Sequence, residues 1–321
     1  MTVSNKPTST PLHIALTPWH LDKSGHAEDL VRQAEVAEDL GFHSFWLPEN
    51  HFGDERSLPS PLTTLAAVAG RTRRIGLGTT SYLLPIRHPI QAAEEVAVLD
   101  RLSGGRLILG VGRGVQPAMF DVFDIDTREK RRHFRDNLAI MTDAWQGKPI
   151  RYHEGEPVLL SPLPVQQPHP PIWIAAFGPL ALKQAGQLGA PYLASPVETL
   201  AQLISNYERH EQFAREAGHS INIRPVMRTV FISEKPAEVN AVREALAGSG
   251  SHAMRGENVD VADWTLLGSL EQVSEQIAHH QQVLGMTHLI ARGRLPGVSG
   301  PQWMRSLEAL ATLQQAEGKS A

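Results

Sequence analysis

The sequence contains no cysteine among its 321 residues. This absence excludes disulfide bonds, a thiolate nucleophile, and every metal or iron–sulfur site that depends on thiolate ligands. Long hydrophobic runs are also missing, because no stretch approaches the roughly 20 apolar residues that a membrane-spanning helix requires. The first ten residues, MTVSNKPTST, lack the apolar segment of a secretory signal. We therefore expect a cytoplasmic protein with no membrane partner and a disordered tail over residues 1–11.

Excess positive charge is a third feature that the sequence lacks. The formal net charge is -4, with 30 basic and 34 acidic residues, whereas a nucleic-acid partner requires clustered positive charge. The apolar and charged fractions, 41% and 20%, are ordinary for a globular protein. A chain of this length can form one large hydrophobic core, so we expect a single domain over residues 12–321.

Predicted strands and helices alternate along the chain about eight times. Parallel strands need crossover helices, and this number of units favours an α/β fold closed into a (β/α)8 TIM-type barrel over an open doubly wound sheet. The expected strands cover residues 12–17, 44–47, 75–80, 106–111, 172–176, 192–194, 222–233 and 287–291. The expected helices cover residues 27–40, 61–69, 88–102, 128–145, 180–188, 197–217, 237–247, 270–284 and 302–315.

Three segments depart from the alternation. Residues 116–126 are expected to form a polar loop, and the proline-rich residues 147–170, after helix four, an insertion with a short strand or two. Residues 248–268, after strand seven, are expected to form a second insertion. Its apolar residues Met254 and Trp264 suit a lid that closes over a substrate. The alternative is a solvated excursion, that is, a solvent-exposed loop, in which Trp264 packs on a neighbouring helix.

The candidate site lies at the carboxyl ends of the strands, where α/β folds place their chemistry. Arg113 stands there between two glycines, so it is either a phosphate ligand or a surface arginine in a tight turn. Phe177 and Gly178 precede a helix whose free amide groups suit an anion, although an ordinary helix start has the same sequence. The small residues of GTTS (78–81) suit either a flat aromatic ligand or a packed turn.

Histidines add polar groups at the same edge of the predicted barrel. His51 follows strand two directly after Glu49 and Asn50, and His88 follows strand three. Each histidine is either a general base or hydrogen-bond donor, or a rim residue with its bonds satisfied within the fold. The fifteen histidines show no HxH or HExxH pattern, so we expect no metal site.

Taken together, these motifs resemble the bacterial luciferase-like flavin monooxygenase family over residues 12–310. The most specific segments are WLPENHF (46–52), GTTSYLLPIRHP (78–89), LDRLSGGRLILGVGRG (99–114) and PPIWIAAFGP (170–179). The resemblance implies a TIM-type barrel that uses reduced FMN and O2 on a small-molecule substrate. It also implies a separate NAD(P)H:flavin reductase and a homodimer. A deazaflavin-dependent hydride-transfer oxidoreductase and a flavin-binding protein without catalysis are the alternatives.

The same resemblance implies roles for individual residues. Thr80 and Ser81 would lie behind the flavin ring, joined by a non-prolyl cis peptide, and Arg113, Arg131 and the amide groups of Phe177 and Gly178 would hold the phosphate. The full set expected to bind the cofactor is Glu49, Thr79, Thr80, Ser81, Gly112, Arg113, Arg131, Phe177 and Gly178. The residues expected to act in catalysis are Asn50, His51 and His88.

Two positions depart from the light-emitting members of the family. Asn50 stands where those proteins have a catalytic histidine, and Gly112 stands where they have a reactive cysteine. Both differences argue against aldehyde oxidation with light emission. They leave the substrate of this chain open.

Overall fold

A computed structural model of the chain describes residues 11–21, 27–53, 57–248 and 259–318. The eight strands expected from the sequence are all present within these ranges; three have the expected length, four are one or two residues shorter, and β10 is four residues shorter. Their bounds are β1 (His13–Leu16), β2 (Ser44–Leu47), β3 (Gly76–Thr79), β5 (Leu107–Gly112), β8 (Ile172–Ala175), β9 (Tyr192–Leu193), β10 (Pro225–Ile232) and β12 (His288–Arg292).

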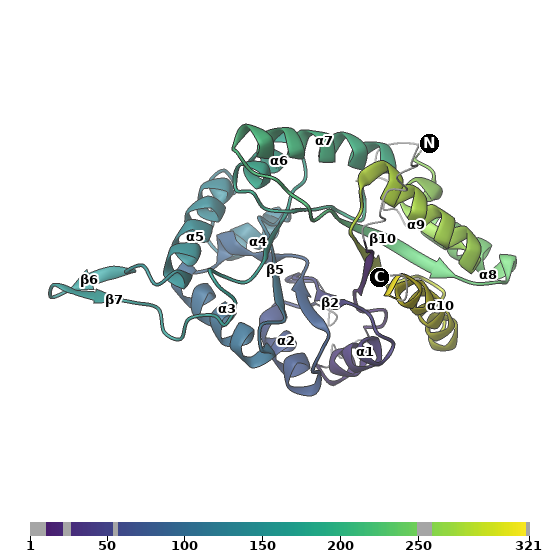
Figure 1. Cartoon of the computed structure of the whole chain (residues 1–321), viewed down its shortest axis with the longest axis horizontal. Coiled ribbons are helices and arrows are strands. Elements are labelled where there is room, and N and C mark those ends of the chain that lie inside the picture. Colours follow the sequence, from purple (N-terminus) through teal and green to yellow (C-terminus); the bar gives the residue numbers. More distant parts are fainter. Residues whose placement is uncertain (1–10, 22–26, 54–56, 249–258, 319–321) are drawn as a thin grey trace, which may run out of the picture.

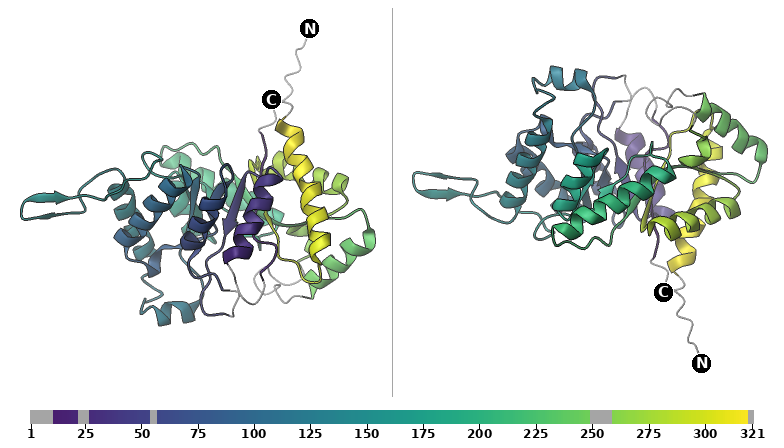
Figure 2. Two further views of the ribbon diagram at one scale, coloured as in Figure 1. Left: turned by 90° about the horizontal axis from the view of Figure 1, so that it is seen from below. Right: turned by 90° about the horizontal axis from the view of Figure 1, so that it is seen from above.

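The expected helices are also present, and they lie on the outer side of the sheet (Figures 1 and 2). Proline occupies the first turn of several of them. The missing N–H of proline costs nothing there, because the first amide groups of a helix have no hydrogen-bond partner within it. Their bounds are α1 (Ala27–Asp39), α2 (Pro61–Arg71), α3 (Pro89–Ser103), α5 (Lys130–Trp145), α6 (Pro179–Gln187), α7 (Leu200–Glu216), α8 (Pro236–Ala247), α9 (Leu270–Leu284) and α10 (Gly300–Gly318).

The large sheet is parallel throughout, which confirms the expected α/β class. The strand order is β11-β10-β12-β1-β2-β3-β5-β8-β9, so the last expected strand, β12, lies beside the first. The sheet curls into a partial barrel in which, among the described residues, no ladder joins β9 to β10. Complete (β/α)8 closure and the division into a tail and one domain therefore stay predictions, and residues 1–10 of the expected tail lie outside the described residues.

Some elements were not expected from the sequence. The segment expected to be a polar loop contains α4 (Pro117–Val122), because Met119 and Phe120 are buried against Leu83. The segment expected to be the second insertion ends in η3 (Val261–Asp263) and β11 (Thr265–Gly268). Strand β11 pairs with the C-terminal half of β10. A short strand β4 (Tyr82–Leu83) and a 3-10 turn η1 (Leu84–Ile86) follow β3.

The proline-rich segment 147–170 contains a two-stranded antiparallel hairpin, formed by β6 (Arg151–His153) and β7 (Glu156–Val158). Figure 1 shows that this hairpin projects away from the body of the molecule. All six of its strand residues are exposed. Among the described residues, every helix is too short or too polar to cross a lipid bilayer.

Alternate residues of each strand face opposite sides of the curled sheet. One side packs against the helices and forms the main apolar core. The other side faces the inside of the curl, where Ala15, Trp46, Trp173, Met227 and Ile290 belong to a separate buried cluster. The rings of Trp46 and Trp173 are stacked, with their centroids 4.8 Å apart, and they fill the middle of the partial barrel.

The stack of tryptophans depends on a glycine in the neighbouring strand. A Cβ added at Gly78 would lie 2.1 Å from Cδ2 of Trp46, and Trp46 is fully buried. Packing against Trp46 therefore accounts for the glycine at the start of GTTS.

We expect Gly78→Ala to destabilise the protein by about 1–3 kcal/mol, because an added methyl group in a packed core forces neighbouring groups to move. The measurement is the free energy of unfolding in urea. Gly70→Ala is the matched control, since this exposed glycine lies in α2 with nothing within 4 Å of the added Cβ. Equal effects of the two substitutions would contradict the packing role of Gly78.

Candidate active site

A cavity of about 650 Å³ opens at the carboxyl ends of β3, β5 and β8. The site was expected at the carboxyl ends of the strands, and most of the residues expected to form it line this cavity. These residues are Glu49, Asn50, Thr80, Ser81, Gly112, Arg113, Arg131, Phe177 and Gly178.

A buried carboxylate anchors one wall of the cavity. The side chain of Glu49 is fully buried, and its Oε1 accepts hydrogen bonds from Arg87 Nη2 at 2.6 Å and pairs with His51 Nε2 at 2.8 Å. Its Oε2 accepts the backbone N–H of Leu83 at 2.9 Å. Arg87 also stacks over the ring of Tyr82, with 3.9 Å between Cζ and the ring centroid. These contacts connect the loop after β2 to the segment after β3.

Small residues form the back of the cavity because two backbones approach closely there. Thr79 Oγ1 donates to the carbonyl oxygen of Gly110 at 2.7 Å, and a Cβ added at Gly110 would meet the carbonyl oxygen of Thr79. A Cβ added at Gly112 would lie 2.0 Å from Ser81 Oγ. Any side chain at position 112 would therefore require Ser81 to move. The peptide bond between Thr80 and Ser81 is cis, which confirms the expectation.

Three cations gather at one end of the cavity. Arg113 follows β5, while Lys130 and Arg131 begin α5. Burial lowers the pKa of Arg113, and the charge of Arg131 lowers it further. Burial and the charges of both arginines lower the pKa of Lys130. Like charges held this close favour a bound anion, because an anion relieves their repulsion.

The start of α6 lies at the same end of the cavity. Gly178 precedes this helix with a φ of 93°, a conformation that glycine adopts without strain. The first amide groups of a helix have no partner within it, and they carry partial positive charge. Together with the three cations, the first turn of α6 makes this end of the cavity suitable for a phosphate group.

A smaller cavity of about 310 Å³ adjoins the first one at its other end. The two cavities share Asn50, Thr80, Pro196 and Met227. The smaller cavity is also lined by Arg292, the last residue of β12, and by Arg294. Asn50 accepts the backbone N–H of Leu58 through its side-chain carbonyl at 3.0 Å, which leaves its amide NH2 group available to a ligand.

Three of the expected residues do not line either cavity. Thr79 is buried behind the wall, bonded to Gly110. His51 is buried behind Glu49 and packs against Phe123, with 5.3 Å between ring centroids. His88 is exposed at the start of α3, because the 3-10 turn η1 leads the chain out of the cavity. The catalytic roles expected for His51 and His88 stay predictions.

Only part of the segment 248–268, for which a lid was one of two alternatives, belongs to the described residues. Residues 249–258, including Met254, lie outside the described residues. Trp264 is 1% exposed and belongs to the main core; the lid and the solvated excursion both stay predictions.

Sequence reasoning did not identify Arg87, Lys130, Met227, Arg292 or Arg294. Arg87 could have been suggested by its place beside His88 in the same loop. Lys130 precedes Arg131, and only the fold shows that both side chains reach the cavity. Arg292 and Arg294 lie about 180 residues from Arg113 in the sequence, at the end of β12 and just after it. Their position after a strand was the available signal.

The sequence pattern of the luciferase-like monooxygenase family matches residues 10–288 of the chain. The flavin-dependent trigonelline monooxygenase, oxygenase component, of Acinetobacter baylyi is 28% identical over 67% of this chain and 62% of its own length. The uncharacterised protein y4vJ of Sinorhizobium fredii is 33% identical over 70% of this chain and 66% of its own length. The matched region thus spans less than two thirds of these relatives.

Solved structures resemble the whole fold. Monooxygenase RslO1 from Streptomyces bottropensis has a TM-score of 0.81 and 26% identity, with 94% of this chain and 98% of that chain covered. The oxygenating constituent of 3,6-diketocamphane monooxygenase from Pseudomonas putida, in complex with FMN, has a TM-score of 0.77 and 20% identity, with coverage of 95% and 98%. The F420-dependent tetrahydromethanopterin reductase of Methanopyrus kandleri has a TM-score of 0.70 and 20% identity, with coverage of 95% and 98%. At 20% identity, the last two show likeness of fold alone.

The environment of Glu49 predicts a measurable cost of removing its charge. We expect Glu49→Gln to lower the free energy of unfolding by about 3 kcal/mol, because a neutral amide leaves the buried side of Arg87 without its anion. Glu35→Gln is the matched control, since Glu35 pairs with the exposed Arg71 at 2.8 Å and such surface pairs contribute about 0–1 kcal/mol. The measurement is the free energy of unfolding of both variants in urea. A loss for Glu49→Gln no greater than the loss for Glu35→Gln would contradict this prediction.

Proposed function

Because the chain belongs to the luciferase-like monooxygenase family, we propose that it is a flavin-dependent monooxygenase that uses reduced FMN and O2 on a small organic substrate. The observation that carries the proposal is the division of one cavity into two chemical regions. One end has three cations and the first turn of α6, which suit a phosphate. The adjacent wall has Thr80, Ser81 and Gly112, whose small size suits a flat ring system.

The residues that line the cavity fit FMN as the bound group. Arg113, Lys130, Arg131 and the amide groups at Phe177 and Gly178 would hold its phosphate, and Thr80 and Ser81 would support the ring. The flavin supplies the redox chemistry with O2 when it is bound. The protein supplies orientation and a cavity with an apolar lining, and such a lining limits the access of water.

Other parts of the proposal concern partners and location. An oxygenase that uses reduced FMN needs a source of it, so we propose a separate NAD(P)H:flavin reductase. A homodimer and a cytoplasmic location also remain part of the proposal. Asn50 contributes an amide NH2 group where light-emitting relatives have a histidine, and we propose that it donates a hydrogen bond and does not act as a base.

The proposal predicts that the phosphate of FMN is recognised by Arg113. A charged hydrogen bond is worth about 1.5–3 kcal/mol, so Arg113→Ala should weaken FMN binding roughly ten- to a hundredfold. The measurement is titration calorimetry with FMN and, in parallel, with riboflavin, which has the same ring and no phosphate. Riboflavin binding should be nearly the same in Arg113→Ala and in the wild-type protein.

Arg128→Ala is the matched control for this test, because Arg128 is exposed nearby and pairs with Asp126. An unchanged dissociation constant for FMN in Arg113→Ala would overturn the phosphate assignment. A deazaflavin that binds at least tenfold more tightly than reduced FMN would favour the hydride-transfer alternative. Binding of reduced FMN with no incorporation of ¹⁸O2 into any of a panel of organic compounds would favour a flavin-binding protein without catalysis.

A further inference from the structure

The smaller cavity beside the proposed flavin site is lined by two arginines that have no acidic partner within the described part of the chain. Arg292 is partly buried, and burial followed by the charge of Arg294 lowers its pKa. Among the described residues, no carboxylate pairs with either arginine. Asp29 lines the outer groove beside them, but it bonds instead to Gln33 at 2.9 Å and to His20 at 3.2 Å.

The backbone that carries these arginines is fixed. Gly293, between them, donates its N–H to Thr17 Oγ1 at 3.2 Å. A Cβ added at Gly293 would lie 2.7 Å from Cα of Trp19, so the segment packs tightly against the chain after β1. A guanidinium that is partly buried, unpaired and held in place is costly unless a ligand supplies the opposite charge.

The position of the two arginines relative to the larger cavity indicates what that ligand is. The three cations at Arg113, Lys130 and Arg131 lie at the end that suits a phosphate, whereas the smaller cavity adjoins Asn50, Thr80 and Met227. A molecule in the smaller cavity would therefore lie beside the ring region of the larger one. We propose that the substrate carries a carboxylate, which Arg292 binds with help from Arg294, while its reacting part faces the flavin ring. This inference rests on the proposed function.

A small planar carboxylate and its neutral amide test the proposal. We expect benzoate to bind the FMN-loaded wild-type protein at least tenfold more tightly than benzamide, because a carboxylate can accept two N–H donors of one arginine. Arg292→Gln should reduce this preference to less than about threefold. Titration calorimetry in chloride-free buffer measures the affinity of both ligands. Acetate and acetamide form a second acid–amide pair, which is small enough not to depend on the shape of the cavity.

Arg305→Gln is the control, because Arg305 is exposed on α10 and should keep the wild-type preference. Equal affinity for acid and amide in the wild-type protein, or binding of neither pair, overturns the proposal. So does a preference that survives Arg292→Gln. FMN affinity is measured in the same samples, so that failure of the flavin assignment is seen separately from failure of the carboxylate assignment.

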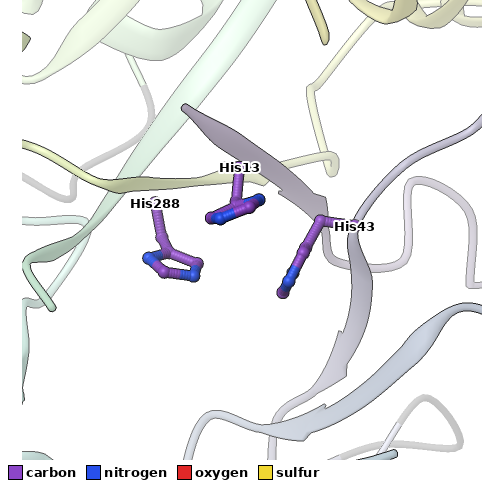
Figure 3. A group of neighbouring side chains, drawn as sticks. All are labelled: His13, His43 and His288. Atoms are coloured by element: carbon purple, nitrogen blue, oxygen red, sulfur yellow. The ribbon is translucent and has the colours of Figure 1, made fainter. Parts of the chain in front are cut away.

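A second and independent observation lies at the opposite end of the sheet. His13 is the first residue of β1, His288 is the first residue of β12, and His43 immediately precedes β2. His13 and His288 are partners across the ladder, and the three strands are neighbours in the sheet. Figure 3 shows the three imidazoles gathered together, and one ligand nitrogen from each lies within 4.8 Å of the others.

Each of two histidines is oriented by a neighbouring hydroxyl group. His43 Nδ1 lies 3.0 Å from Ser44 Oγ, and His288 Nδ1 lies 2.8 Å from Thr287 Oγ1. These contacts leave Nε2 of both rings for another ligand. Histidines that bind metals commonly use the second ring nitrogen in this way, which fixes the orientation of the ring. Burial lowers the pKa of His43 to about 4 and that of His288 to about 3, so both rings are neutral at pH 7.

We infer that His13, His43 and His288 form a binding site for one divalent transition-metal ion such as Zn²⁺, with a fourth position left for water. Nitrogens on one tetrahedral zinc lie about 3.3 Å apart, from Zn–N distances of about 2.0–2.1 Å, so modest side-chain rotations would bring the ligand atoms together. The ion would connect the first, second and last strands of the sheet. Trp173 packs against His288, with 5.1 Å between the ring centroids, and stacks on Trp46.

The test uses untagged protein dialysed against a chelator. We expect the wild-type chain to bind one Zn²⁺ with a dissociation constant of about 1 μM or tighter, measured by competition with a chromophoric chelator, and to melt at a higher temperature with zinc. His288→Ala and His43→Ala should each weaken binding at least tenfold. His153→Ala, an exposed histidine of the hairpin, should leave binding unchanged.

Binding weaker than about 100 μM in the wild-type protein, or equal binding in the His288→Ala variant, overturns the metal site. Co²⁺ provides a measurement that needs no substitution. Wild-type protein with Co²⁺ should show the intense visible absorption of a four- or five-coordinate ion with nitrogen ligands. The weak spectrum of hydrated Co²⁺ would overturn the assignment, even if the histidine variants fail to fold.

Discussion

The close approach of β3 and β5 is the constraint on which the rest of the site depends. The hydrogen bond from Thr79 to the carbonyl oxygen of Gly110 holds the ends of these strands together, and the glycines of β5 have no room for side chains. Because the strands are held this way, Thr80 and Ser81 face the cavity while Thr79 lies behind it. The first two glycines of the GxGxG pattern are therefore explained by close packing against Thr79 and Ser81.

The alternation of side chains along one strand connects both ends of the molecule. In β12, His288, Ile290 and Arg292 face the inside of the curled sheet, since Ile290 belongs to the inner cluster and residues two apart share a face. His288 lies in the histidine cluster, Ile290 packs in the middle, and Arg292 reaches the smaller cavity. One strand of five residues thus contributes to three different environments, and a shift of its register by one residue would lose all three.

The sequence was sufficient to predict the order of eight strands of the large sheet and of the nine helices that cover it in the part of the chain that the structure describes, because apolar runs and helix-stopping glycines are local signals. It also placed Arg113 at the edge where the cavity lies, since this residue follows a predicted strand, while phosphate binding by Arg113 stays a prediction. It could not identify the histidine cluster, whose members stand at positions 13, 43 and 288 and have no common spacing. The same is true of the pairing of Glu49 with Arg87, since only the curl of the sheet brings two loops together. The helix α4 was missed because Met119 and Phe120 are buried by contacts with Leu83, which a short polar segment does not reveal.

The hairpin of β6 and β7 has a consequence for experiments on the whole protein. Its turn contains Glu154 and Gly155, both with positive φ, and its two strands form a sheet of their own that pairs with no other strand of the described residues. Pro157 has no N–H to offer to a further strand, which limits association through this edge. A fluorophore or an affinity peptide attached at this turn would stand away from both ends of the curled sheet. The hairpin is therefore the natural place to immobilise the protein while both proposed sites stay open to solution.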